Sequence, residues 1–236
     1  MAWGDTTRKT EVGGGGVASV NVTLNDTVAG NFIAAGTSAW KSTGAPAAVA
    51  MSDGTNGAYT QSLFTSVGLT AVSLHYFANG AGGAISVTSD PSGGGAGDAN
   101  DLYMALHEFS GGDTTSPASG TPATATGTST TADTGTMTPA DDSVLLLAVL
   151  DYDSSGTITE NAGGEGFTLS NERDIGAGNG PDPGQPGSMV FKILSGAPGT
   201  PGHTWSFSSS ADWACGIAAF KAAAAGTSIL RQMLMQ

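Results

Sequence analysis

Apolar and polar side chains alternate along many short stretches of this chain, and this alternation constrains the fold more than any other feature. In the segment VASVNVTLN, every second residue is apolar, at Ala18, Val20, Val22 and Leu24. Successive side chains of a β-strand point to opposite faces, so a period of two predicts a strand with one buried face.

The pattern recurs along the chain, with turn-forming residues between the segments. Gly accounts for 37 of the 236 residues, and the dipeptides DG and NG in SDGTNG favour tight hairpin turns. We therefore expect an all-β fold, a jelly-roll-like antiparallel β-sandwich of roughly ten strands. The expected strands are 17–25, 47–53, 58–66, 69–79, 82–90, 101–111, 142–152, 187–196, 203–210 and 213–222.

Two segments carry a more specific prediction about their place in a sheet. DSVLLLAVLDY (142–152) is apolar on both faces, which predicts a central and fully buried strand. ATATGTSTT (123–131) alternates Thr with small residues, and its β-branched but polar side chains favour an exposed edge strand.

The chain divides into three parts by composition. Residues 1–16 end in VGGGG and are expected to form a flexible N-terminal arm, because glycine runs lack side chains that hold a conformation. Residues 17–221 form the expected sandwich domain. Residues 222–236 form a C-terminal tail whose apolar residues would share one face of a short helix: Ile229, Leu230, Met233 and Leu234. Two interpretations stay open, a frayed end and a docking peptide that binds a neighbouring protein.

Charge and cysteine content exclude several classes of protein. The net charge is −13, from 20 acidic and 7 basic residues, and no basic stripe is present to bind nucleic acid. The single cysteine, Cys215, rules out an intrachain disulfide. The N-terminus lacks the apolar core of a secretory signal, and no apolar run is long enough to span a membrane. We expect synthesis in a cytoplasm and no membrane partner.

The segment LDYDSSGTITEN (150–161) resembles a calcium-binding loop in part. Asp151, Asp153 and Ser155 stand at alternate positions and Gly156 follows, as in the first half of an EF-hand loop. Position twelve of such a loop would be Ala162 instead of a bidentate Glu, and a strand precedes the segment where a helix belongs. Calcium binding is one interpretation, and an acidic, solvated turn without a cofactor is the other.

No motif for catalysis emerges from the chain. A Gly-x-Ser-x-Gly elbow and a phosphate-binding GxxxxGK loop are both absent. The three histidines are scattered, and strand alternation places His107 and Glu108 on opposite faces. The sequence thus predicts a protein that is not an enzyme. Trp40, beside Lys41, is the best candidate for an exposed aromatic ring that stacks on a sugar.

The order of motifs resembles a β-sandwich domain of structural proteins in tailed bacteriophages and related bacterial reading frames. The similarity covers most of residues 17–236 and is carried by strand and turn patterns: VNVTLND…AGNFIAA, DGTNGAYTQ, GGAISVTSD…DLYMALHEFSG, DDSVLLLAV and W…GIAAFKAA. The closing SILRQMLMQ is also similar to tails on such proteins.

This resemblance implies a virion component, such as a capsid decoration protein, an accessory head protein or a tail protein. It implies no catalytic residues. We accordingly expect a homo-oligomer that binds copies of itself and other virion proteins through many weak contacts. The alternative is a carbohydrate-binding module or adhesin on the surface of a cell or virion.

Overall fold

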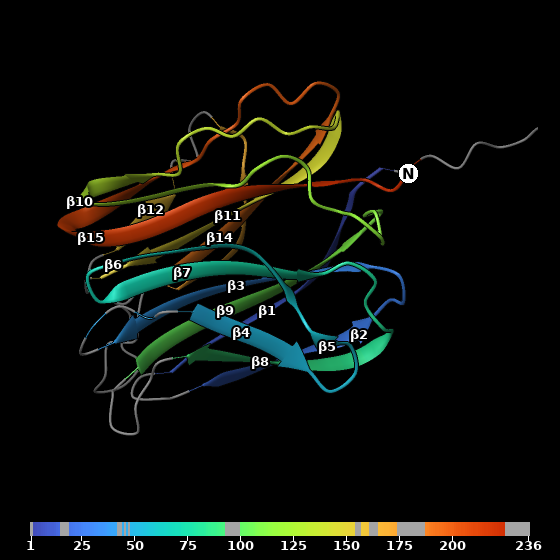
Figure 1. The fold of residues 1–236 in the computed structure, drawn as a ribbon, viewed down its shortest axis with the longest axis horizontal. Helices are drawn as coiled ribbons and strands as arrows, with labels where there is room; N and C mark the ends of the chain where they lie inside the picture. Colours follow the sequence, from blue (N-terminus) through green and yellow to red (C-terminus); the bar gives the residue numbers. More distant parts are fainter. Residues whose placement is uncertain are drawn as a thin grey trace, which may run out of the picture.

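Fifteen strands and no helix make up the part of the chain that the computed structural model describes, namely residues 2–14, 19–41, 44, 46, 48–92, 100–153, 157–160, 165–173 and 187–224. The strands form three antiparallel sheets stacked as layers (Figure 1). The all-β, sandwich-like fold predicted from the sequence is confirmed, with three layers and more strands than expected.

The central sheet has the order β1-β9-β3-β7-β6. Its strands are β1 (Gly4–Gly14), β9 (Asn100–Ser110), β3 (Phe32–Lys41), β7 (Thr70–Phe77) and β6 (Thr60–Val67).

The two outer sheets differ in size. The small outer sheet has the order β2-β8-β4-β5, with β2 (Val20–Thr27), β8 (Gly83–Ser92), β4 (Ala48–Asp53) and β5 (Gly57–Ala58). The large outer sheet has the order β10-β15-β11-β14-β13, with β10 (Ala123–Asp133), β15 (Thr204–Lys221), β11 (Ser143–Tyr152), β14 (Gly187–Ser195) and β13 (Thr168–Arg173). Strand β12 (Ile158–Glu160) pairs with β15 beside this path.

Apolar side chains fill the space on both sides of the central sheet. On β3, Phe32 and Ala34 join a core with the large outer sheet, whereas Ile33 and Ala35 join a core with the small outer sheet. The first eight residues of β3 are buried without a break. The central sheet is therefore a middle layer covered by a sheet on each face, as the ribbon in Figure 1 also shows.

A third core lies on the other face of the large outer sheet. Leu146 and Leu150 of β11 point into it, together with Trp205, Trp213 and the fully buried Cys215 of β15. Leu145 and Leu147 point the opposite way, into the core shared with the central sheet. Strand β11 pairs with β14 and β15 and is buried on both faces, so the central strand predicted from its apolar run is confirmed.

The structure differs from the expected N-terminal arm over residues 4–14. These residues form β1, which pairs with β9 at one edge of the central sheet. Trp3 anchors the start of the strand: it is 5% exposed, and its Nε1 donates to the Phe220 carbonyl oxygen at 3.1 Å. Its ring also packs edge-on against Phe32 and Phe109. The polar sequence of residues 4–14 does not predict a strand, because the residues that hold Trp3 in place come from distant parts of the chain.

Other sequence predictions have mixed outcomes. The Thr-rich segment does form an edge strand, β10. The two segments expected at 203–210 and 213–222 are one long strand, β15, and strands β3, β12 and β13 were not expected. Of the expected docking tail, 222–236, only residues 222–224 are described, and the rest lies outside the described part of the chain. No helix in the described residues is long and apolar enough to cross a membrane.

Gly36 of β3 lies where the central and large outer sheets approach each other closely. A Cβ atom at this position would lie 2.9 Å from Val149 Cγ1 and 3.1 Å from Met189 Sδ. Gly36→Ala is expected to destabilise the protein by about 1–3 kcal/mol, because the added methyl overpacks a filled core. Chemical denaturation measures this effect. Gly54→Ala is the control, since nothing lies within 4 Å of that position, and equal losses in both variants would contradict the expectation.

Candidate functional site

The end of β11 brings together two of the residues expected to bind calcium. Asp151 lies in β11, and Asp153 lies one residue beyond the end of this strand. Asp151 is fully buried, and its Oδ2 accepts hydrogen bonds from Thr70 Oγ1 and, at 3.0 Å, from the backbone N–H of Ala71. This carboxylate joins the large outer sheet to the first residues of β7.

Asp153 lies beside the aromatic residue expected to bind sugar. Burial of the carboxyl group raises the pKa of Asp153 above its usual range; the nearby Trp40 side chain acts to lower the pKa, and repulsion from Asp212 adds to the rise. The backbone N–H of Asp153 also donates to the Asp212 carbonyl oxygen at 2.8 Å. Trp40 is half-buried, so it is less exposed than a free sugar-stacking platform.

The end of β11 therefore holds carboxylates beside an indole ring. It contains two of the predicted calcium ligands, Asp151 and Asp153, and the predicted sugar-binding residue Trp40. Ser155, the third expected calcium ligand, and the tail residues Ile229, Leu230, Met233 and Leu234 lie outside the described residues. Within the described ranges, no group of three or more His, Cys, Asp or Glu side chains is placed to hold a metal ion. Calcium binding and sugar binding here stay predictions.

Asp153→Asn is expected to raise the melting temperature at pH 7 by about 1 to 3 °C, a small gain because the group is partly exposed and screened. A carboxyl group with a raised pKa in the folded protein destabilises that state when it is ionised, and this penalty disappears as the pH falls through the folded pKa. The gain should therefore shrink toward pH 4. Thermal unfolding across this pH range measures it.

Asp53→Asn is the matched control, with the opposite sign. Burial acts to raise the pKa of Asp53, but hydrogen bonds from Asn56, Thr55 and Tyr59 outweigh it and lower the pKa. Asp53→Asn should destabilise the protein at pH 7. A loss of stability in both variants would contradict the interpretation of Asp153.

Hydrogen bonds through Asp5, His107 and Ser170 link the central sheet to the large outer sheet, with Asp5 at the solvent-exposed end. His107 of β9 lies 2.8 Å through Nε2 from Asp5 Oδ1 and 2.6 Å through Nδ1 from Ser170 Oγ. These residue types form the catalytic triad of many hydrolases. Here His107 is 0% exposed and Ser170 is 1% exposed, and Phe109 and Phe191 pack against the imidazole ring. His107 and Ser170 are both buried in the described structure, and their hydrogen bond connects the two layers.

Glu108, the next residue on β9, points away from His107, as strand alternation predicted. Its Oε1 accepts hydrogen bonds from the Val28 N–H at 2.7 Å and from Asn31 Nδ2 at 2.8 Å. The sequence did not reveal the chain formed by His107, because Asp5 lies 102 residues and Ser170 lies 63 residues away from it. No local motif could report such a contact.

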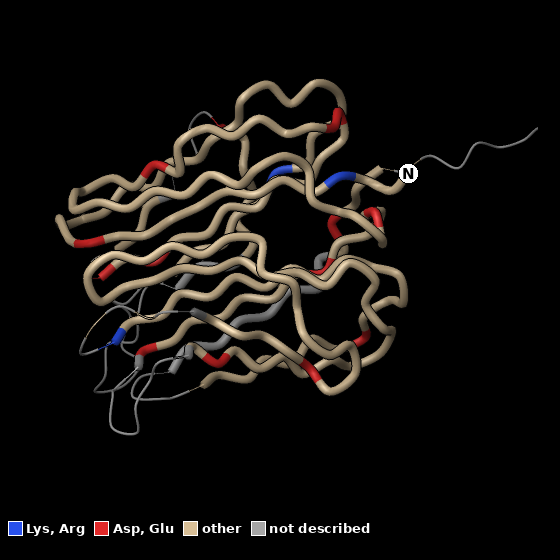
Figure 2. The backbone as a smooth tube through the Cα atoms, viewed as in Figure 1, with Lys and Arg blue, Asp and Glu red and all other residues tan. Residues whose placement is uncertain are grey.

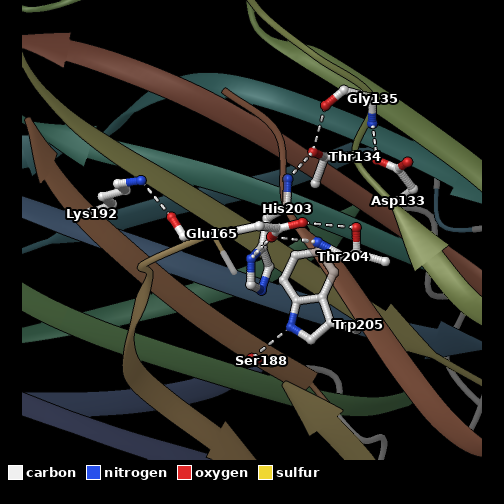
Figure 3. Close-up of polar contacts among 9 residues, drawn as sticks. All are labelled: Asp133, Thr134, Gly135, Glu165, Ser188, Lys192, His203, Thr204 and Trp205. Carbon is white, nitrogen blue, oxygen red and sulfur yellow. Dashed lines mark hydrogen bonds and ion pairs between the residues drawn. The ribbon is translucent and has the colours of Figure 1, made fainter. Parts of the chain in front are cut away.

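A second histidine–carboxylate pair lies in the large outer sheet, just before the start of β15 (Figure 3). His203 Nδ1 lies 2.6 Å from Glu165 Oε2. The same carboxylate accepts hydrogen bonds from the Thr204 N–H at 3.0 Å and the Thr204 hydroxyl at 3.1 Å. Lys192 Nζ donates to the Glu165 carbonyl oxygen. These contacts fasten residue 165, which precedes β13, to the start of β15 and to β14.

Two aromatic rings pack against the same histidine, and threonine and serine hydroxyls accept hydrogen bonds from the backbone of His203 and from one of these rings. The ring of His203 packs edge-on against Trp205, with centroids 4.4 Å apart, and lies 4.7 Å from Phe167. Its backbone N–H donates to Thr134 Oγ1 at 3.0 Å, and Trp205 Nε1 donates to Ser188 Oγ at 3.3 Å. His203 is 2% exposed. This cluster, like that of His107, is packed within the protein.

The third histidine, His75 of β7, joins the central sheet to the small outer sheet. It is 2% exposed, and its Nε2 donates to the Val49 carbonyl oxygen of β4 at 3.1 Å. Nearby in the register, Thr37 Oγ1 donates to Ser89 Oγ at 3.2 Å across the same interface. Burial, opposed by the bond to Val49, lowers the pKa of His75 from 6.5 to about 4.

His75 makes the stability of the protein depend on pH between about 6.5 and about 4. The unfolded chain binds a proton at His75 in this window and the folded protein does not, so acid favours unfolding. Between pH 7 and pH 4.5 the free energy of unfolding of His75→Gln should therefore fall by about 2 to 3 kcal/mol less than that of the wild type. Urea denaturation at both pH values measures this difference. Parallel losses in the wild type and His75→Gln would contradict it.

No protein-family model matches the chain, and no curated protein or solved structure is significantly similar to it. The function must therefore be argued from the chain itself.

Proposed function

We propose that this protein is a structural component of a tailed-phage particle, either a capsid decoration or accessory head protein or a tail protein, and that it works by binding other proteins without catalysing a reaction. The observation that supports a structural role is the burial of all three histidines. His75, His107 and His203 are each at most 2% exposed, and each links strands that are distant in the sequence.

Enzymes place groups that exchange protons where a substrate can reach them. In this protein His107 and His203 are packed among aromatic rings. His75 and His107 each link two sheets, and His203 links two segments of the large outer sheet. The assignment to a phage particle comes from the resemblance of the strand and turn motifs. It is consistent with the net charge of −13, because such a charge keeps a protein present in many copies from aggregating before assembly. Figure 2 marks the positions of the acidic and basic residues along the backbone.

Attachment to the particle is multivalent in this proposal. Each copy offers strand edges on a rigid three-layer body and the apolar tail residues Ile229, Leu230, Met233 and Leu234. Weak contacts repeated over many copies add up to stable attachment, because each contact raises the effective concentration for the next.

Density-gradient sedimentation of particles from cells that carry the gene tests the proposal. The full chain is expected to sediment with the particles in many copies, as measured by quantitative mass spectrometry. A chain that ends at Ala224 should keep its fold but lose at least about tenfold of this incorporation, since it lacks the apolar tail. Circular dichroism checks the fold of the truncated chain. A full chain that stays in the soluble fraction would overturn the structural function.

A further inference from the structure

Strand β10 forms an open edge of the large outer sheet. It pairs with β15 on one side, and no other described strand pairs with it. Its register with β15 is unbroken over seven residues, from Ala123 to Ser129, before a bulge. The unpaired side of such a strand presents a row of backbone N–H and C=O groups that can bind another strand.

The remaining outer edges are interrupted or charged. Strands β2 and β6 keep a regular register for five residues each, Val20–Leu24 and Leu63–Val67, beside a bulge. Strand β13 is broken by a register shift and contains Glu172 and Arg173. Strand β1 contains Lys9 and Glu11, and β5 has two residues. Short length, bulges and charges are the devices that protect sheet edges from pairing. The regular part of β10 has none of them.

The composition of β10 favours a second copy of the same strand as its partner. Residues 123–129 carry no charge in a molecule with a net charge of −13. Two copies repel each other over most of their surfaces, and an uncharged edge is where they approach at the lowest electrostatic cost. The run itself has no carboxylate to pair with a basic partner, and the Asp212 carboxylate of β15 that contacts it already accepts a hydrogen bond from Thr128 Oγ1 at 2.5 Å.

The segment is also nearly symmetric about Thr126. If two copies pair antiparallel with Thr126 at the twofold axis, Thr124 lies opposite Thr128 of the second copy. Ala125 then lies opposite Gly127. Exposed threonines face threonines, and small residues face small residues, so two backbones can approach to the spacing of sheet neighbours, about 4.8 Å.

We propose that the β10 edges of two copies pair across a twofold axis at Thr126, so that two large outer sheets form one continuous sheet. The inference deepens the proposed structural function, on which it rests, by naming a second copy as a partner. A single strand edge is a small interface, so the dimer is weak in isolation. On a particle, where copies are held close together, it becomes stable. Salt strengthens it by screening the repulsion between the acidic bodies.

Sedimentation equilibrium of the full chain tests this pairing, at concentrations from about 10 µM to about 1 mM, where small interfaces dissociate. The mass of the wild type should rise from 23.2 kDa toward the dimer value. Thr126→Lys and Thr126→Glu should each weaken the association at least about tenfold, because each places like charges opposite one another at the axis. An equimolar mixture of the two variants should restore the dimer, because the opposed charges then attract.

Thr23→Lys is the matched control. Thr23 is an exposed threonine on the edge strand β2, so this variant should associate like the wild type. A wild type that stays monomeric throughout, or a Thr126→Lys variant that associates like the wild type, would overturn the pairing at β10. Neither result affects the incorporation of the protein into particles, which is measured separately and tests the proposed function. The mixture of variants also separates a lost interface from a misfolded chain, because misfolded chains would not regain the dimer.

Discussion

The central sheet is covered on both faces in the described part of the chain, by the small outer sheet on one side and by the large outer sheet on the other. A polar side chain buried between these layers cannot turn toward water, so it must find its partner inside the protein or cost stability. His75, His107 and Glu108 all lie on this sheet, and each meets a partner from another segment. The same constraint accounts for Gly36, where the layers approach too closely for a Cβ atom.

Polar contacts between the layers use residue types that are also common in active sites. Asp5, His107 and Ser170 have the composition of a catalytic triad, but the stacking that brings them together buries His107 and Ser170 and leaves only Asp5 in contact with solvent. Buried hydrogen bonds between sheets specify how the sheets align, since an apolar interface alone would tolerate a shifted register. A body built in this way is suited to present fixed edges and surfaces to neighbouring proteins.

The sequence predicted individual strands where a local pattern was strong. The apolar run of β11 indicated a central strand, and the alternation of threonine with small residues in β10 indicated an edge. Strand β3 was missed, because residues 32–41 include several small side chains and show no alternation when both faces are buried. Strand β1 was missed because its residues are polar and glycine-rich. It forms because β9 offers it an edge and Trp3 is anchored on Phe220.

By itself, the sequence determined that the chain forms β-strands, that these strands pack as a sandwich, and that the protein is acidic. These properties follow from the spacing of neighbouring residues and from composition, and both are local quantities. Tertiary structure alone decided that three layers form instead of two and that Asp5 and Ser170 meet on His107. It also decided that Asp153 and Trp40 become neighbours. Strand pairing and sheet stacking bring together residues from distant parts of the chain, and no local pattern records which segments will meet.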